Sequence, residues 1–183
     1  MKWTIDDLIA ATPELAAMPA TSARLLDLLE EPDAPVGDLV AVIETDPGLT
    51  ANLLKLCNSA YYGLRGEVGS VREALVRLGN RTVVTLAFAA SMGRLLQAPV
   101  TGYRLPRGQL WRHALATGLV AARLLPAAAD AGERNRAFTA GLVHDLGKLL
   151  LDQPLRESLE QLPPDLDDTD LVRRERHLLG FDH

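Results

Sequence analysis

The segment from Asp46 to Gly63 constrains the fold of this chain more than any other stretch. Its first two residues, Asp46 and Pro47, predict the start of a helix, because aspartate accepts hydrogen bonds from first-turn amides and proline is pre-set for the first helical position. Apolar residues then recur at helical spacing, at Leu49, Leu53 and Leu56. The run Asn-Ser-Ala-Tyr-Tyr-Gly breaks this pattern from residue 58 onwards. We therefore predict a core helix followed by a polar and aromatic loop.

Similar start and stop signals divide most of the chain into helices. Thr21 and Ser22 can cap one helix and Asn80 another, while Ser70 with Glu73 predicts a capping box for a short helix. The helix that follows Asn80 is apolar on several faces, which is typical of a buried central helix. The predicted helices cover residues 21–29, 36–44, 47–57, 71–78, 82–96, 109–125, 133–144 and 170–179. With no convincing strand pattern and no internal repeat, the predicted fold class is all-α.

The composition supports packed helices and disfavours several other classes of protein. Hydrophobic residues make up 48 % of the chain and aromatic residues only 4 %, so the core consists mainly of leucine, valine and alanine. The net charge is −5 with no cluster of basic residues, which disfavours binding to nucleic acid. No apolar run approaches the roughly 18 residues of a membrane span. Acidic residues near the N-terminus disfavour a signal peptide. The chain has a single cysteine, Cys57, which excludes an internal disulfide and which we predict to be a small buried apolar residue. From these features together we expect a soluble, cytoplasmic protein.

The segment 98–106 is the best candidate for an internal boundary, because it holds two prolines and a glycine within nine residues. We predict one helical subdomain over residues 1–98 and a second over residues 99–183. The sequence ends at Gly-Phe-Asp-His183 with no cap and no completing element. The second subdomain is therefore expected to be truncated at its C-terminus.

A histidine followed directly by an aspartate, His144 and Asp145, is the strongest candidate for chemistry. An imidazole nitrogen and a carboxylate both suit a divalent transition metal. On a helix the two side chains diverge by roughly 100°, so one ion can bind both only at a helix end or bend, and Gly147 supplies flexibility there. His113, on an earlier helix, is the candidate third ligand. Taken by itself, His113 is predicted to be a core histidine. If its helix lies antiparallel to the helix that carries His144 and Asp145, a metal or anion site shared by the three residues is an equal alternative.

Three further residues in the second half are candidates for binding groups. Lys148 lies one helical turn beyond Asp145, and it either binds a phosphate or forms an ion pair with a nearby carboxylate. His177 lies in the charged run Arg-Arg-Glu-Arg-His, where a solvated surface is the expected environment. His183 is the last residue, and the local sequence assigns it no role.

The first half offers no catalytic set, but its loop is distinctive. Asn58, Tyr61 and Tyr62 place polar and aromatic groups directly after a predicted helix, in a chain that is poor in aromatic residues. One interpretation is a turn whose tyrosines pack against the core. The other is a recognition loop for a ligand or partner.

Two segments of the first half resemble the signature of HDOD domains. They are Asp-Pro-Gly-Leu-Thr-Ala-Asn-Leu-Leu-Lys-Leu-Cys-Asn-Ser-Ala-Tyr-Tyr-Gly over 46–63 and Ser-Val-Arg-Glu-Ala-Leu-Val-Arg-Leu-Gly over 70–79. Leu-Trp-Arg-His at 110–113, Ala-Gly-Leu-Val-His-Asp-Leu-Gly-Lys at 140–148 and the final Leu-Gly-Phe-Asp-His fit the same family. The resemblance covers roughly residues 18–183.

The resemblance implies a multi-helix fold, in which an N-terminal helical subdomain precedes a bundle like that of the HD phosphohydrolases. HDOD domains occur in bacterial signalling proteins, often beside receiver, cyclic-di-GMP turnover or kinase-type modules, and are regarded as lacking the full catalytic set. Carried over from the metal-dependent HD enzymes, His113 matches the first histidine ligand, His144 with Asp145 matches the pair, and His183 matches the additional histidine of the cyclic-di-GMP phosphodiesterases.

This chain lacks the downstream His-His pair and the terminal aspartate ligand of those enzymes, because it ends at His183. The leading hypothesis is therefore a noncatalytic signalling module that binds a partner protein or a small ligand. It has no catalytic residue and requires no cofactor, although a divalent metal can be accommodated. The alternative is a metal-dependent phosphohydrolase acting on nucleotides or cyclic dinucleotides, with Lys148 steering the phosphate. A weaker alternative is a nucleic-acid-binding regulator.

Overall fold

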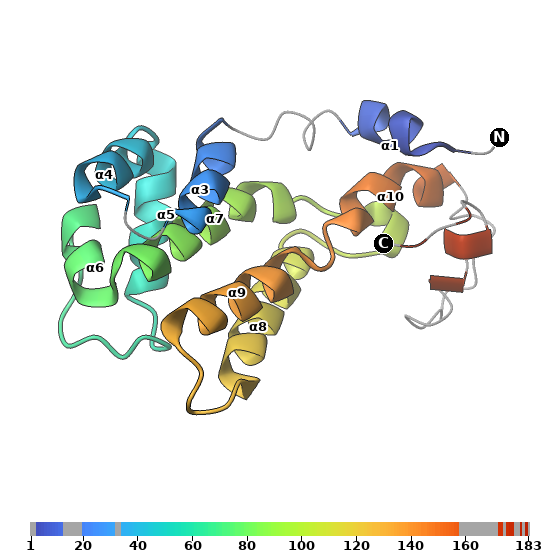
Figure 1. The fold of residues 1–183 in the computed structure, drawn as a ribbon. Helices are drawn as coiled ribbons and strands as arrows, with labels where there is room; N and C mark the ends of the chain where they lie inside the picture. The colour runs from blue at the N-terminus through green and yellow to red at the C-terminus, as the bar shows by residue number, and fades with distance from the viewer. Residues whose placement is uncertain are drawn as a thin grey trace. The chain divides into compact units, whose positions relative to one another are not determined.

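The computed structural model describes residues 3–12, 20–31, 34–157, 172–173, 175–177, 180 and 182. In these parts of the chain the regular structure is helical, and the only β-type pairing is an isolated bridge between Val100 and Leu105. The helices, drawn in Figure 1, are α1 (Ile5–Ala11), α3 (Ala20–Glu30), α4 (Val36–Glu44), α5 (Pro47–Cys57), α6 (Val71–Leu78), α7 (Asn80–Leu96), the 3-10 helix η1 (Thr101–Tyr103), α8 (Gln109–Leu124), α9 (Ala131–Val143) and α10 (Gly147–Glu157). The prediction of an all-α fold is confirmed.

The start of α5 follows the chemistry of its first residues. The carboxylate of Asp46 accepts hydrogen bonds from the amides of Gly48 and Leu49 at 2.8 and 3.0 Å. Pro47 occupies the first helical position, where its missing amide hydrogen costs nothing. At the far end Cys57 is fully buried, and burial raises the pKa of its thiol to about 11, as expected for a packed, unreactive cysteine.

Two predicted caps have other roles. Thr21 and Ser22 lie inside α3, which already begins at Ala20, so neither is an N-cap. Asn80 is the first residue of α7, and its side-chain amide donates to the carbonyl of Ala34 at 3.3 Å. Asn80 thus connects α7 to the segment before α4, a long-range contact that a local pattern does not reveal.

The predicted capping box of α6 is only half formed. Ser70 accepts from the amide of Glu73 at 3.1 Å, as predicted. The carboxylate of Glu73, however, accepts from the amide of Gly69 at 3.0 Å instead of from Ser70. The helix ends as predicted at Gly79, whose φ of +80° favours glycine.

The sequence patterns missed α1 and α10, and they placed the start of α9 two residues late. Asp130 and Glu133 exchange hydrogen bonds between their side chains and backbone amides at 2.8 and 2.9 Å, so that a reciprocal box opens α9 at Ala131. Half of the predicted helix over 170–179 lies outside the described residues, and residues 172–173 and 175–177 within it are helical.

The contacts within the chain define two compact units. Unit 1 comprises Met1–Met18, Leu95–Ala116 and Val143–His183, and unit 2 comprises Pro19–Arg94 and Thr117–Leu142. These units group residues by contact and do not coincide with the ranges 1–98 and 99–183. The predicted division at residue 98 therefore stays a prediction.

In unit 2, α7 is the buried helix that the sequence predicted. Its residues 83–93 are all buried. The hydroxyl groups of Thr85 and Ser91 bond to carbonyls of their own helix at 2.9 and 2.7 Å, so burial leaves neither unpaired. Helix α4 packs against α3, α5 and α6 in the same unit (Figure 1).

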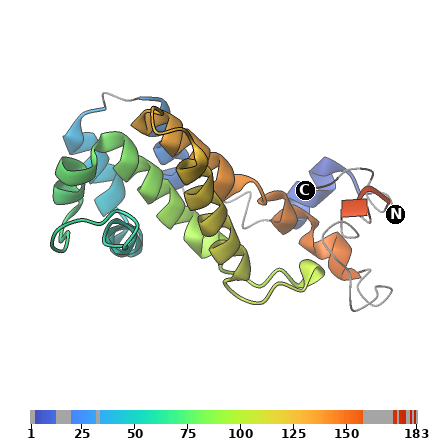
Figure 2. The same cartoon turned by 90° about the horizontal axis from the view of Figure 1, so that it is seen from below.

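Two glycines let α9 approach the second half of α8 at backbone distance. A Cβ atom built on Gly141 would lie 2.7 Å from the Cα of Gly118, and one on Gly118 would lie 2.7 Å from the carbonyl oxygen of Phe138. The two helices run side by side in both views (Figures 1 and 2). Any larger residue at Gly118 or Gly141 would force the helices apart.

In unit 1, α10 packs against η1 and α1. The buried carboxylate of Asp152 accepts from the amide of Gly102 at 2.6 Å and forms an ion pair with Arg156. Asp152 therefore fixes η1, and with it Tyr103, beside α10. No helix in the described part of the chain is long and apolar enough to cross a membrane.

Candidate functional site

His144 and Asp145 lie in the short connection between two helices of the second half. Helix α9 ends at Val143 and α10 begins at Gly147, so the pair occupies a break in helical structure. The backbone carbonyl of Asp145 accepts from the amide of Lys148 at 3.0 Å, which starts the next helix. The pair therefore lies at a helix end, the kind of position at which the sequence predicts that both side chains can reach one ion.

The structure brings His113 to the pair. The two Nε2 atoms of His113 and His144 are 3.2 Å apart. Oδ2 of Asp145 lies 3.3 Å from Nε2 of His113 and 3.5 Å from Nε2 of His144. The three donor atoms thus form a nearly equilateral triangle in unit 1. The structure thus places His113 beside the pair, and the role of the three residues as metal ligands stays a prediction.

Lys148 completes what we call the histidine cluster: His113, His144, Asp145 and Lys148. Nζ of Lys148 lies 2.8 Å from Oδ2 of Asp145, the same oxygen that both histidines face. The Asp145 side chain is only 5 % exposed, and a carboxylate that is so buried needs a compensating charge. Of the two predicted roles for Lys148, the ion pair with Asp145 is the one that the structure shows.

The position of Lys148 is supported from a second side by Tyr103. Its ammonium nitrogen lies 5.7 Å from the centre of the Tyr103 ring, within the range of a cation–π interaction. The hydroxyl of Tyr103 donates to Oε1 of Glu175 at 2.5 Å. Burial, reinforced by this hydrogen bond and by the charge of Glu175, raises the pKa of Tyr103, so the ring stays neutral. Lys148 is therefore held between a carboxylate and an aromatic face.

The donor set of the cluster also fits a divalent transition metal. Nitrogen and oxygen ligands bound at about 2.1 Å to one ion lie about 3.0 to 3.4 Å from one another, close to the 3.2, 3.3 and 3.5 Å observed. His113, His144 and Asp145 form the one group of at least three potential ligands found among the described residues. Three ligands leave positions open for water or substrate. For Oδ2 of Asp145 to bind a metal ion, its ion pair with Lys148 would have to break.

The remaining predicted ligands do not join this cluster in the described structure. His177 is exposed and is not part of the ligand group. His183 lies outside the described residues, so its predicted match to an additional histidine stays a prediction. Tyr103 and Glu175 were missed, because neither carries a local signal; only the fold places them beside Lys148.

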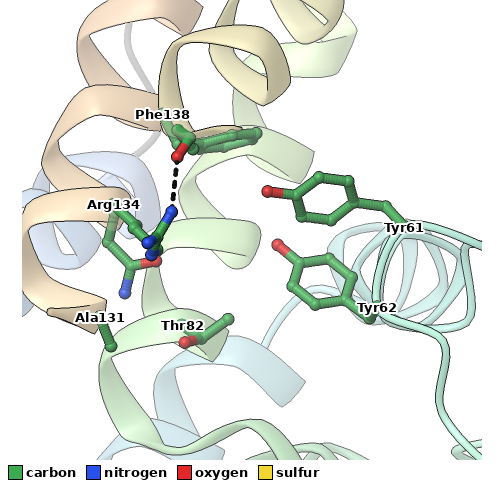
Figure 3. Close-up of a pocket in the computed structure, with 8 residues that line it drawn as sticks. Tyr61, Tyr62, Thr82, Ala131, Arg134 and Phe138 are labelled. Atoms are coloured by element: carbon green, nitrogen blue, oxygen red, sulfur yellow. Dashed lines mark hydrogen bonds between the residues drawn. The ribbon is translucent and has the colours of Figure 1, made fainter. Parts of the chain in front are cut away.

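The predicted recognition loop has two parts with different roles. The side-chain amide of Asn58 bonds to both backbone groups of Val68, at 3.0 and 2.8 Å, and so closes the loop. Tyr61 and Tyr62 contact each other edge to face at 5.0 Å and line a cavity in unit 2 (Figure 3). Asn58 thus holds the loop in place, whereas the two tyrosines line the cavity, and a role of the loop in recognition stays a prediction.

Comparisons with known proteins find relatives that are similar to this chain in sequence or in fold. A family model for the HDOD domain matches residues 15–183. An uncharacterized protein of Treponema pallidum (strain Nichols) is 33 % identical over 148 residues, which are 79 % of this chain and 28 % of that protein. A crystal structure of an HDOD domain protein with unknown function from Geobacter sulfurreducens aligns with a TM-score of 0.70 and 21 % identity, over 98 % of this chain and 62 % of that one.

The MmoQ response regulator from Methylococcus capsulatus str. Bath is 29 % identical over 89 % of this chain and 64 % of its own, but its TM-score of 0.33 is too low for the two folds to be compared. The chain spans about a quarter of its Treponema relative and less than two thirds of each of these solved structures. The HDOD model, by contrast, leaves only the first 14 residues unmatched. Together with the shared helical fold, this match shows that the chain belongs to the HDOD domain family.

Proposed function

We propose that the chain is a noncatalytic signal-transduction module that binds a partner protein or a small ligand. Two arguments support this function. The resemblance to HDOD domains implies a regulatory role, and the chain is a member of that family. The histidine cluster, in addition, contains its own cation.

The observation that carries the proposal is the position of Lys148. A metal ion in a hydrolase must reach the carboxylate oxygen that faces both histidines. In this chain the ammonium group of Lys148 already lies 2.8 Å from that oxygen and only 15 % of its side chain is exposed. The ion pair neutralises Asp145 and links α10 to the turn before it. The cluster therefore acts as a structural element of the module.

The test is a hydrolysis assay on the purified 183-residue chain. A cyclic dinucleotide and bis(4-nitrophenyl) phosphate are offered after loading with Mn²⁺, Fe²⁺, Zn²⁺ or Mg²⁺. We expect no rate above that of a sample without protein. Hydrolysis that disappears in His144→Ala and persists in His177→Ala, an exposed histidine outside the cluster, would contradict the proposal.

One specific observation favours a second function, that of a metal-dependent phosphohydrolase. The spacing of Nε2 of His113, Nε2 of His144 and Oδ2 of Asp145 suits the three ligands of a divalent ion. Such an ion, when bound, supplies a Lewis acid and lowers the pKa of a bound water. His113 and His144 are 56 % and 36 % exposed, so the ligand nitrogens are accessible to an ion from solvent. Released from Asp145, Lys148 would be free to pair with a phosphate.

A nucleic-acid-binding role has the weakest support. The net charge of −5 opposes the phosphate backbone, and no basic cluster stands out in the sequence. Retention on a DNA column that falls steeply as salt is raised would favour this third function over the other two.

A further inference from the structure

A cavity of about 220 Å³ lies in unit 2, and none of its lining residues belongs to the histidine cluster. We call it the tyrosine cavity. Its walls come from the loop after α5 and from α7, α8 and α9 (Figure 3). Its lining includes aromatic and polar side chains, those of Tyr61, Tyr62, Thr82, Arg134, Asn135 and Phe138. Since one water occupies about 30 Å³ of liquid, the space suits a molecule with a single ring.

The first indication of a ligand is an unpaired donor. The side-chain nitrogen of Asn135 is buried and has no hydrogen-bond partner in the part of the chain that the structure describes. Buried amide groups are almost always paired with protein, water or ligand. Asn135 lines the cavity, and its amide nitrogen has almost no accessible surface, so a molecule inside the cavity can supply the missing acceptor once the terminal amide turns toward it.

The second indication is the charge of Arg134. Its guanidinium donates to the carbonyl oxygens of Ala122 and Pro126 at 3.1 and 2.8 Å, which fixes it at the end of α8. Carbonyl groups orient the guanidinium but do not cancel its charge. No carboxylate forms an ion pair with Arg134 among the described residues. The cavity wall is therefore locally positive in a chain that is acidic overall.

The third indication is the aromatic lining. Tyr61, which is 45 % exposed, forms an edge-to-face pair with the half-buried Tyr62, and the buried ring of Phe138 lines the cavity from α9. The hydroxyl ends of both tyrosines are directed toward Arg134 and Phe138 (Figure 3). Burial raises the pKa of Tyr62, so its hydroxyl remains protonated and can donate.

We propose that the tyrosine cavity binds a small aromatic carboxylate. Its ring contacts Tyr61, Tyr62 and Phe138, and its carboxylate accepts from the amide of Asn135 and faces the charge of Arg134. Hydrogen bonds between a charged acceptor and several donors are stronger than neutral ones, and aromatic walls exclude water around them. This inference rests on the proposed function, because it specifies the small ligand of the module.

The test uses benzoate as the probe and the isotope-labelled full chain. Two-dimensional NMR spectra record the side-chain amide of Asn135 and the surrounding backbone amides during a titration. We expect saturable shifts with a Kd of about 1 mM, as suits a ligand of few atoms. Benzyl alcohol, which has the ring without the charge, should bind about fivefold more weakly.

Two variants make the test decisive. Asn135→Asp replaces the donor by a repelling carboxylate and should weaken benzoate binding at least about tenfold. Arg136→Gln removes a charge from an exposed position on the same helix, outside the cavity lining, and should leave the Kd unchanged. Each variant is first required to retain the wild-type amide spectrum elsewhere.

Absence of benzoate shifts, equal binding of benzyl alcohol, or an unchanged Kd in Asn135→Asp would each overturn the proposal. None of these results depends on metal or on hydrolysis. Failure of the ligand proposal is thus distinguishable from failure of the proposed function, which the hydrolysis assay tests at the histidine cluster.

Discussion

In the histidine cluster the buried carboxylate of Asp145 faces an ammonium group at 2.8 Å, whereas in the tyrosine cavity the buried amide nitrogen of Asn135 has no partner among the described residues. The first site is balanced by groups that the chain itself provides. The second has a positive charge, aromatic walls and one buried donor that no group among the described residues pairs. A family resemblance draws attention to the first site, but the unmet hydrogen-bonding capacity belongs to the second.

The difference also shows in what holds each site together. Charge pairing between neighbouring segments maintains the cluster. The cavity depends instead on the close approach of α8 and α9, which Gly118 and Gly141 permit. Substitutions should therefore affect stability and binding differently at the two sites.

The largest effect is expected from Gly141→Ala. The added methyl group would meet the backbone of Gly118 and Thr117 within 3 Å, so α8 and α9 must separate. We expect the free energy of unfolding, measured with urea, to fall by about 3 kcal/mol. Benzoate binding at the tyrosine cavity should weaken as well. Gly37→Ala is the matched control, since nothing lies within 4 Å of its Cβ position; an equal loss in that variant would refute the close-contact explanation.

A smaller effect is expected from Asp145→Ala. Removing the carboxylate leaves the ammonium of Lys148 partly buried without its counter-charge. Loss of one partner from a fully buried pair costs about 3–5 kcal/mol; because Lys148 and both histidines retain some exposure, we expect about 2 kcal/mol by urea unfolding. Asp38→Ala, at an exposed position in α4, should cost less than about 0.5 kcal/mol. If both variants lose the same stability, the charge-pairing account of the cluster is wrong.

Asp46, which starts the helix leading to the tyrosine loop, gives a pH-dependent prediction. The pKa of Asp46 lies below its ordinary value of 3.8, chiefly because the carboxylate accepts a hydrogen bond from the amide of Leu49. The positive charge of Arg94 lowers it further. The carboxylate therefore contributes stability above that value, and the contribution is lost as the pH falls through the lower folded pKa. We expect Asp46→Ala to cost about 1 kcal/mol near neutral pH.

The matched variant is Asp46→Asn, which retains an acceptor for the cap but loses the ion pair with Arg94 at 2.7 Å. It should cost less than the alanine variant. The gap between wild type and Asp46→Ala should narrow in acid below the folded pKa, because protonation removes the charge of Asp46 but leaves a carbonyl acceptor for the cap. A gap that stays constant down to that pH would mean that the charge of Asp46 plays no part.

The sequence predicted those features that depend on neighbouring residues. The start of α5 at Asp46 and Pro47, the end of α6 at Gly79 and the burial of α7 all follow from caps, turns and periodicity, and all are observed. For His113 the sequence left two alternatives open, a core histidine and a site shared with the pair, and the structure places its Nε2 atom 3.2 Å from that of His144.

What the sequence could not predict depends on distant contacts. Asn80 has the local chemistry of a cap, but it bonds to Ala34, 46 residues away. Tyr103 reaches Glu175 across 72 residues and so fixes Lys148. Asn135 looks like an ordinary helix residue, and only packing buries its amide nitrogen beside a cavity. Helix α10 contains Pro154, which conceals its helical pattern.

We infer that Lys148 takes the place of a metal ion at the histidine cluster. Titration of Zn²⁺ into the wild-type chain and into Lys148→Met tests this inference most directly. Methionine preserves most of the side-chain volume and removes the charge, so Oδ2 of Asp145 becomes available. Calorimetry should show about fivefold tighter binding in Lys148→Met, equivalent to about 1 kcal/mol. Lys55→Met, at an exposed position in α5, should bind Zn²⁺ as the wild type does. Equal affinity of wild type and Lys148→Met would contradict the claim.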